Sequence, residues 1–249
     1  MFEQKIIDLN ADLGEGLATD AELIPLISSA NIACGYHAGD KETMIRTVEL
    51  CLQHGVAVGA HPSFPDRENF GRKEMTLEPG SLREMLIAQL RLISEVCNET
   101  GATLHHVKPH GALYNMSARD ANLARLVAET VFDFNPGLKL FGLSGSHSIA
   151  EGVMAGLSTV AEVFADRTYM PDGSLTPRSL PNALINDEGE ALRQALSLAL
   201  DHQVVATNGS VIDVMAESIC LHGDGPHAVS FARLIKQTFF NHGIIIRSV

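Results

Sequence analysis

The sequence predicts an α/β fold, a single β/α barrel of seven or eight strands with an irregular, TIM-like arrangement. Short β-type runs alternate with helical patterns, which is typical of βα units and a mainly parallel sheet. Apolar runs also end, within a few residues, at groups that can do chemistry. No repeat, low-complexity segment or linker marks a second unit. We therefore expect residues 1–249 to form one barrel domain.

Six apolar runs are the predicted strands, at residues 5–9, 31–34, 56–60, 103–107, 159–164 and 219–221. Counting all runs gives seven parallel strands, or eight if residues 244–247 add one. A closed or nearly closed barrel is favoured over an open doubly wound sheet, although right-handed crossovers permit both.

Helical spacing of apolar residues predicts six helices, at residues 40–55, 81–101, 120–134, 147–156, 187–201 and 226–242. Ser81 and Glu84 have the spacing of a capping box, and Gly101 follows as a stop signal. Asn208 and Gly209 lie between two short β-type runs, which predicts a hairpin.

Two long loops interrupt the alternation, at about residues 62–80 and 165–186, and both follow a strand. Loops of that length in a compact domain are usually functional or disordered. These two contain apolar and aromatic residues such as Phe64, Phe70 and Tyr169, so we expect ordered lids.

Composition narrows the class of protein. The formal net charge is -12, from 30 acidic and 18 basic side chains, and no basic stripe suggests nucleic-acid binding. The four cysteines form no CxxC pair, which argues against a structural zinc cluster or a disulfide scaffold. The chain has no signal-peptide pattern at its start and no run of about 20 apolar residues. We expect a cytoplasmic protein without a membrane segment.

In a parallel barrel the carboxyl ends of the strands and the loops after them form the active face. Asp8, Asn10 and Asp12 alternate along the first strand, so their side chains point the same way, with Glu15 in the following turn. For Asn10, bonding to neighbouring backbone is an equally good interpretation. For Asp12 it is weaker, because a buried carboxylate without a partner is costly.

Four histidines, His37, His61, His110 and His222, each follow a different predicted strand. Any one of them alone is more often a surface or hydrogen-bonded core residue, but the recurrence of the placement favours a shared site. Neutral imidazoles beside Asp12 could hold zinc, manganese or iron. A divalent metal on Asp12, His37 and His61 is therefore a hypothesis.

Basic side chains also fall near the predicted mouth of the barrel. Lys108 ends an apolar run and precedes a proline, which restricts its backbone and would aim its side chain. Its ammonium could bind a carboxylate or a developing oxyanion. Arg67, Arg72 and Arg167 lie in the long loops, where the alternative for each is an ion pair that orders the loop.

Motifs for nucleotide binding and for a serine nucleophile are missing. The sequence has no phosphate loop, no Gly-x-Gly-x-x-Gly after a strand and no Gly-x-Ser-x-Gly elbow. It therefore has no recognisable nucleotide site of its own.

Several blocks, which span nearly the whole chain, resemble the LamB/YcsF family. They lie at residues 8–15 (DLNADLGE), 30–40 (ANIACGYHAGD), 59–63 (GAHPS), 107–114 (VKPHGALY), 162–178 and 220–224 (CLHGD). One stretch departs from the family pattern, with Asn69 and Lys73 where Gly and Arg are expected. We expect Asn69 to tolerate the left-handed backbone that a glycine would supply, whereas Lys73 lacks the planar fork for bidentate binding.

The resemblance implies the A subunit of a bacterial ATP-dependent 5-oxoprolinase, a hydrolase that opens the lactam of 5-oxoproline to glutamate, with partner B and C subunits. It implies a barrel similar to those of polysaccharide deacetylases and an ATP site on the partners. Asp12 with His61 or His110 would then position or deprotonate water, and Lys108 completes the expected catalytic set. The expected substrate-binding residues are Asn10, Glu15, His37, Asp40, Arg67, Asp166, Arg167, His222 and Asp224.

Two other interpretations stay open. The barrel could be a non-catalytic subunit that binds substrate and shields a labile intermediate. It could also be a stand-alone metal-dependent deacetylase or amidase that uses the same face.

Overall fold

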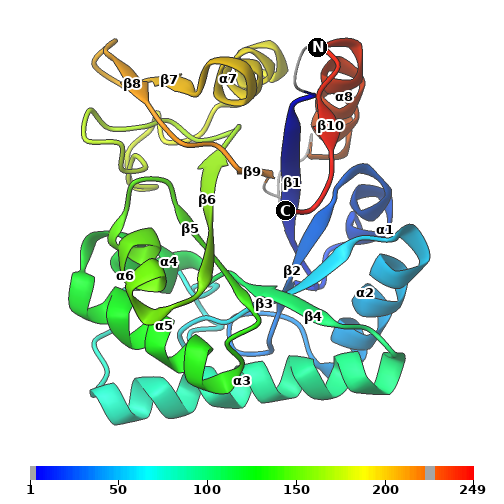
Figure 1. Cartoon of the computed structure of the whole chain (residues 1–249), viewed down its shortest axis with the longest axis vertical. Coiled ribbons are helices and arrows are strands. Elements are labelled where there is room, and N and C mark those ends of the chain that lie inside the picture. The colour runs from blue at the N-terminus through cyan, green and yellow to red at the C-terminus, as the bar shows by residue number, and fades with distance from the viewer. Residues whose placement is uncertain (1–3, 222–227) are drawn as a thin grey trace.

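Seven parallel strands close into a barrel in the computed structural model, which describes residues 4–221 and 228–249 (Figure 1). The strand β1 pairs with both β2 and β9, so the ring has no open edge. The predicted closed β/α barrel is confirmed. Its strands are β1 (Ile6–Leu13), β2 (Ser29–Ala33), β3 (Ala57–His61), β4 (Leu104–Val107), β5 (Lys139–Leu143), β6 (Ser158–Phe164) and β9 (Ser218–Leu221).

The alternation of side chains along β1 separates the core from the barrel interior. Ile7, Leu9 and Ala11 are buried in the apolar core. Asp8 and Asn10 are also fully buried, but their polar side chains bond to residues of other strands inside the barrel. A period of two therefore gives β1 one apolar face and one polar face.

Helices surround the strands, and the longest of them runs along the bottom of Figure 1. They are α1 (Asp20–Leu23), α2 (Lys41–His54), α3 (Pro79–Thr100), α4 (Gly111–Arg119), α5 (Ala121–Phe134), α6 (His147–Ala155), α7 (Glu188–Asp201) and α8 (Ala228–Asn241), with a 3₁₀ turn η1 (Ile24–Leu26). Among the helices in the described ranges, none is long and apolar enough to cross a bilayer.

The helices expected at 40–55, 120–134, 147–156 and 187–201 are confirmed within a residue or two. That expected at 226–242 is found from Ala228, and residues 226 and 227 lie outside the described residues. The capping box at Ser81 and Glu84 is wrong, because α3 already begins at Pro79. Proline suits a first helical turn, where its missing N–H is not needed. The sequence reasoning also missed the nine-residue α4.

The predicted hairpin is confirmed as β7 (Gln203–Val205) and β8 (Val211–Asp213), which pair in antiparallel fashion. Gly209 in its turn has φ +85°, a conformation that favours glycine. The short β10 (Ile245–Ile246) pairs with the start of β1, and the seven-stranded ring closes without it.

The segment between β3 and α3 folds around Asp66, whose carboxylate accepts hydrogen bonds from Asn69 Nδ2 at 2.7 Å and from the Lys73 N–H at 3.1 Å. The left-handed backbone expected at Asn69 lies instead at Phe70 (φ +57°) and Gly71 (φ +67°). Asn69 is held by its side-chain bond to Asp66, and the strained position falls on Phe70, whose ring packs against His37.

The segment between β6 and α7 folds around Arg167. Its Nη2 donates to the Thr176 carbonyl at 2.6 Å and its Nε to the Ala183 carbonyl at 3.1 Å. Tyr169 lies fully buried beneath this segment, and its Oη accepts a hydrogen bond from the Phe164 N–H at 2.7 Å. Both long loops are thus ordered by their own polar contacts.

Candidate active site

The deepest layer of the barrel interior is polar and is built on β1. The Asp8 carboxylate accepts hydrogen bonds from Ser28 (2.7 Å), Ser29 (2.6 Å) and Ser218. Burial raises the pKa of Asp8, although the serine hydroxyls act in the opposite direction. Asn10 continues the network, because its Nδ2 donates to Ser218 at 2.7 Å. Residues of β1, β2 and β9 are thereby joined below the site.

Lys108 lies above this layer and joins two carboxylates. Its Nζ is 2.7 Å from Glu162 Oε1 and 2.9 Å from Asp12 Oδ1. It also lies 3.2 Å from Asn10 Oδ1 and 3.1 Å from Cys220 Sγ. Burial alone would lower the pKa of Lys108, but the negative charges of Asp12 and Glu162 outweigh it and raise the pKa well above its usual value.

These four acceptors account for the whole hydrogen-bonding capacity of Lys108, because an ammonium has only three N–H donors. The side chain is 2% exposed. The structure therefore places Lys108 as a bridge that holds Asp12 and Glu162, without a spare donor for a substrate anion. Asp12 Oδ1 is fixed further by Asn31 Nδ2 at 2.9 Å.

Three histidines have their protonation pattern fixed by neighbouring acceptors. His61 Nδ1 lies 2.7 Å from the Lys108 carbonyl, and His110 Nε2 lies 2.9 Å from the Phe70 carbonyl. A carbonyl only accepts, so each of these ring nitrogens carries the proton. His37 Nδ1 lies 2.9 Å from Ser63 Oγ, which itself donates to a backbone carbonyl, so Nδ1 is again the protonated nitrogen.

The other three ring nitrogens converge on one another and on two carboxylates. His61 Nε2 lies 2.9 Å from His110 Nδ1 and 3.2 Å from Asp12 Oδ2. His37 Nε2 lies 3.3 Å from Glu15 Oε1. Acceptor atoms placed this close repel one another unless a proton or a metal cation lies between them. One ligand atom from each of Glu15, His37, His61 and His110 lies within 4.8 Å of the others.

Two imidazoles of this cluster, those of His37 and His110, are neutral, which is the form that binds metals. Burial and the neighbouring His61 lower the pKa of His37 to about 3, and burial lowers the pKa of His110 well below its usual value. Three nitrogens and a carboxylate suit zinc, manganese or iron, and backbone carbonyls that fix the ligand tautomers are typical of such sites. The residues present therefore fit a divalent metal.

The metal hypothesis from the sequence named Asp12, His37 and His61. The structure groups His37 and His61 with Glu15 and His110, while Asp12 lies next to the cluster through its contact with His61.

The loop after β3 covers one side of the cluster. The Phe70 ring stands edge-on to both His37 and His110, with ring centroids 5.5 Å apart in each pair. The Arg72 guanidinium lies 5.0 Å from the centroid of the same Phe70 ring. A Cβ at Gly71 would come within 2.9 Å of both histidines, so only glycine lets the loop approach this closely.

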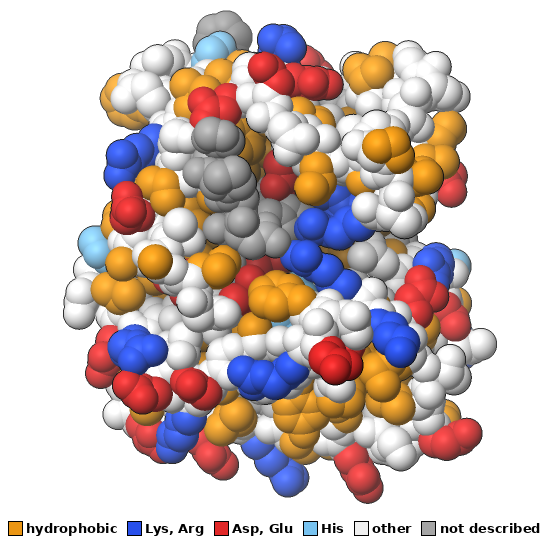
Figure 2. All heavy atoms as spheres, turned by 180° about the vertical axis from the view of Figure 1, so that it is seen from behind, with side chains coloured by type: hydrophobic (Ala, Val, Ile, Leu, Met, Phe, Trp, Pro, Cys, Tyr) orange, Lys and Arg blue, Asp and Glu red, His pale blue; other side chains and the backbone are white. Residues whose placement is uncertain are grey.

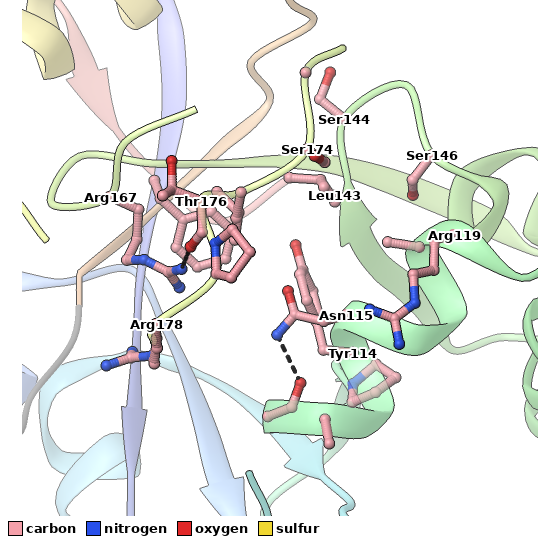
Figure 3. A pocket seen from close by; sticks show the side chains of 18 of the residues that line it. Tyr114, Asn115, Arg119, Leu143, Ser144, Ser146, Arg167, Ser174, Thr176 and Arg178 are labelled. Atoms are coloured by element: carbon pink, nitrogen blue, oxygen red, sulfur yellow. Dashed lines mark hydrogen bonds between the residues drawn. The ribbon is translucent and has the colours of Figure 1, made fainter. Parts of the chain in front are cut away.

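A cavity of about 860 Å³ borders the cluster. Asp12, His61, Lys108 and His110 line its inner end. The start of α6, the helix α4 and the loop after β6 form its walls, as the labelled side chains in Figure 3 show. Figure 2 shows the face opposite to that of Figure 1, where Lys and Arg side chains gather near the centre and acidic ones lie beside them.

Three predicted substrate-binding residues have local structural contacts. The Asp40 carboxylate caps α2 by accepting from the Thr43 N–H at 2.8 Å. Arg67 donates to the carbonyls of Gly35 (2.8 Å) and Gly39 (2.9 Å) and so ties two loops together. Arg167 lines the cavity, but the two donors described above are used on loop carbonyls.

Two further predicted substrate-binding residues, Asn10 and Asp166, lie in the described part of the chain. Asn10 lies below Lys108, and Asp166 lies in the loop after β6, where its backbone carbonyl accepts a hydrogen bond from the Ile185 N–H. The predictions for His222 and Asp224 fall outside the described residues.

Sequence reasoning missed Glu162 and Tyr114. Glu162 is fully buried between Lys108 and Asn10, and a lone carboxylate inside the apolar run of β6 was the signal that could have found it. Tyr114 lines the cavity one helical turn after His110, and no sequence feature distinguishes it from a core aromatic.

Structure comparisons show the same barrel in several deacetylases. The chain matches a family 4 carbohydrate esterase from Streptomyces lividans (12% identity, 97% of this chain and 91% of that chain, TM-score 0.51). It also matches the catalytic domain of a peptidoglycan N-acetylglucosamine deacetylase from Eubacterium rectale (12% identity, 100% and 91%, TM-score 0.55). At these identities the likeness concerns the fold, and it confirms the expected similarity to polysaccharide deacetylase barrels.

A much stronger match is to a lactam utilization protein from Thermus thermophilus. The two chains are 42% identical over 98% of this chain and 99% of that chain, with a TM-score of 0.92. The model of the LamB/YcsF family matches residues 7–249. Because that match extends through every strand of the barrel and both long loops, the chain belongs to the LamB/YcsF family.

Proposed function

We propose that this chain is the A subunit of an ATP-dependent 5-oxoprolinase, which opens the cyclic amide of 5-oxo-L-proline to L-glutamate. Family membership and the similarity to a lactam utilization protein support a lactam substrate. The observation that carries the proposal is the carboxylate of Asp12, held by Lys108 beside a cluster of histidines at the inner end of a cavity.

Amide hydrolysis needs a base for water, and Asp12 suits that role. Water adds to the carbonyl carbon, the C–N bond breaks, and the ring nitrogen takes a proton. Lys108 and Asn31 hold Asp12 Oδ1, which orients Oδ2 toward His61. A positioned base of this kind typically contributes about 10²- to 10⁴-fold to the rate.

Glu15, His37, His61 and His110 would hold a divalent metal in this proposal. Such an ion would supply Lewis-acid chemistry, either by polarising an amide carbonyl or by making water more acidic. The chain's own contribution is to fix the tautomers of the three histidines and to exclude water from the side covered by Phe70.

We assign ATP binding to the partner B and C subunits, because this sequence has no recognisable phosphate loop. An amide resists water, and transfer of the γ-phosphoryl group from ATP to the lactam oxygen would make the carbonyl carbon more electrophilic. Water then opens the ring to an acyl phosphate, and a second water releases phosphate and glutamate. This barrel would carry out the hydrolytic steps.

In the proposed protein, residues 1–249 form one barrel domain whose long loops, at about 62–80 and 165–186, border the site. It also places the protein in the cytoplasm, where ATP is available. The four cysteines, all buried and unpaired, are compatible with a reducing compartment.

One assay tests the function. Glutamate released from 5-oxoproline is measured with and without ATP, the partner subunits and a chelator, and the metal content of the same sample is determined. We expect glutamate only when this chain, the partners and ATP are all present, with loss on chelation.

Two results would contradict the proposal. Full turnover by the partners without this chain would favour a non-catalytic binding role. Turnover without ATP or partners would favour a stand-alone metal-dependent amidase, for which the histidine cluster and the deacetylase-like barrel are the supporting observations.

A further inference from the structure

His106 is a fully buried histidine of β4 that lies outside the histidine cluster and is not among the residues that line the cavity. Its ring stacks on that of Phe141, with ring centroids 4.3 Å apart. Gly59 of β3 pairs with His106 in the sheet, and a Cβ at Gly59 would collide with the His106 ring. Burial lowers the pKa of His106 well below its usual value, so the ring is neutral. A buried imidazole in such a tight space is expected to make hydrogen bonds through its nitrogens.

One side chain, Asn31 of β2, connects this ring to Asp12. His106 Nε2 lies 2.8 Å from Asn31 Oδ1. On the other side of the amide, Asn31 Nδ2 donates to Asp12 Oδ1 at 2.9 Å and to Asn10 Oδ1 at 2.7 Å. Asn31 is fully buried and does not line the cavity either. Side chains from β4, β2 and β1 thus form one hydrogen-bonded path that ends at the proposed base.

The neighbours of Asn31 fix which end of its amide faces which strand. The Asp12 carboxylate, paired with the Lys108 ammonium, only accepts hydrogen bonds. The Asn10 atom that faces Asn31 also receives a hydrogen bond from Lys108 Nζ, so it is the amide oxygen. Both neighbours on β1 are therefore acceptors. The nitrogen of Asn31 must face them, and its oxygen must face His106.

The tautomer of His106 follows from that orientation. An amide oxygen only accepts, so His106 Nε2 carries the proton. His106 Nδ1 then presents a lone pair, and His105 Nδ1, which lies 3.1 Å away, donates to it. Lys139 Nζ lies 3.2 Å from His105 Nε2 and begins the path. Every member donates in the same direction, toward Asp12, and hydrogen bonds arranged in this way polarise and strengthen one another.

We propose that His106 is a positioning residue for the base, a role that rests on the proposed lactam hydrolysis. Through Asn31 it holds Oδ1 of Asp12, so that Oδ2 keeps its direction toward His61. Neither His106 nor Asn31 touches the substrate, and no proton has to move along the path. Loss of the path should therefore slow the hydrolytic step and leave substrate binding almost unchanged.

The test compares His106→Leu with His106→Gln in the complex with its partner subunits and ATP. Leucine removes the donor to Asn31, and we expect kcat to fall about 10-fold with little change in KM, because the base as a whole contributes about 10²- to 10⁴-fold. Glutamine keeps an N–H donor and should recover most of the kcat. Wild-type kcat for His106→Leu, or an equal fall for both variants, would overturn the proposal.

A double variant tests whether His106 acts through Asn31. If it does, Asn31→Ala combined with His106→Leu has the same kcat as Asn31→Ala alone, because the second substitution has nothing left to disturb. Two losses that multiply would overturn the path.

Phe141→Leu is the packing control. It removes ring contact with His106 and leaves the hydrogen bond to Asn31 in place. We expect a lower melting temperature, with the kcat of the folded complex unchanged. A fall in kcat as large as that of His106→Leu would make packing the cause and would overturn the proposal.

A spectroscopic readout on this full chain tests the path without activity. Nitrogen-15 NMR of labelled histidines distinguishes protonated from unprotonated ring nitrogens, and His106→Leu assigns the signals by their loss. We expect the proton of His106 on Nε2, and a proton on Nδ1 alone would overturn the path whatever the activity. A wild-type complex that releases no glutamate, in a chain with the expected tautomer, would instead overturn the proposed function.

Discussion

Replacing Lys108 with methionine is expected to lower the free energy of unfolding by about 3–5 kcal/mol. The side chain is 2% exposed, and its ammonium lies 2.9 Å from Asp12 and 2.7 Å from Glu162. At an effective dielectric constant of about 20, each of these pairs is worth about 6 kcal/mol of Coulomb energy, which offsets the desolvation of the three charges. Without the cation, two buried carboxylates lie close together with no lysine charge between them.

A loss of that size is a large fraction of the about 5–15 kcal/mol that stabilises a typical protein. Urea unfolding at pH 7 measures it, provided that the slope with denaturant stays unchanged. Lys41→Met is the matched control, because Lys41 pairs with Glu99 at 2.6 Å with both side chains half exposed. Such a surface pair is worth only about 0–1 kcal/mol.

The double variant Lys108→Met with Glu162→Gln sharpens the test. Removing the second buried charge should recover about 1–2 kcal/mol relative to Lys108→Met alone, since an uncompensated carboxylate is the main cost. If Lys108→Met costs no more than Lys41→Met, or if Glu162→Gln recovers nothing, the bridging role of Lys108 is refuted.

Three further predictions concern the histidines and the loop that covers them. Zinc added to chelator-treated protein should raise its melting temperature, with about 2.7 kcal/mol of stabilisation at a concentration 100 times Kd. His37→Gln should abolish the shift and His105→Gln should keep it; equal shifts would argue against the cluster as the metal site. Burial lowers the pKa of His106 well below its usual value. The stability that depends on neutral His106 is therefore present above pH 6.5 and is lost as the pH falls below it. The free energy of unfolding should fall by up to about 1.4 kcal/mol per pH unit. His106→Gln should flatten this acid limb in unfolding titrations, and an unchanged slope would show that other groups dominate it. Gly71→Ala should weaken zinc binding, because a Cβ there would meet both His37 and His110 within 2.9 Å. Unaltered zinc binding, measured by calorimetry, would mean that the loop moves to make room for the Cβ.

The barrel and the inner site were predictable because both depend on simple regularities. Alternation along β1 placed Asp8, Asn10 and Asp12 on one side, and parallel strands brought His61 and His110 to the same end. Local signals for Asp40 and Arg67 were open to two interpretations. The structure shows contacts that cap a helix and join two loops.

The sequence alone could not predict that Lys108 pairs with Glu162 inside the barrel. Whether a lysine at a strand end points outward to substrate or inward to a carboxylate depends on the register of β4 relative to β6, which no local pattern reports. Likewise, the tautomers of the histidines depend on carbonyls from other segments, such as that of Phe70 for His110. The direction of those lone pairs is a property of the closed barrel.

The loop that carries Phe70 also has a consequence for the order of binding. Phe70 and Gly71 close the side of the cluster near His37, whereas His61 and His110 line the cavity. In the proposed function, an ion bound at the cluster would therefore share the cavity with the substrate. The metal would then bind first, and a bound substrate would trap it there. Slow loss of metal under saturating substrate, and fast loss without it, would be the kinetic signature of this shared entrance.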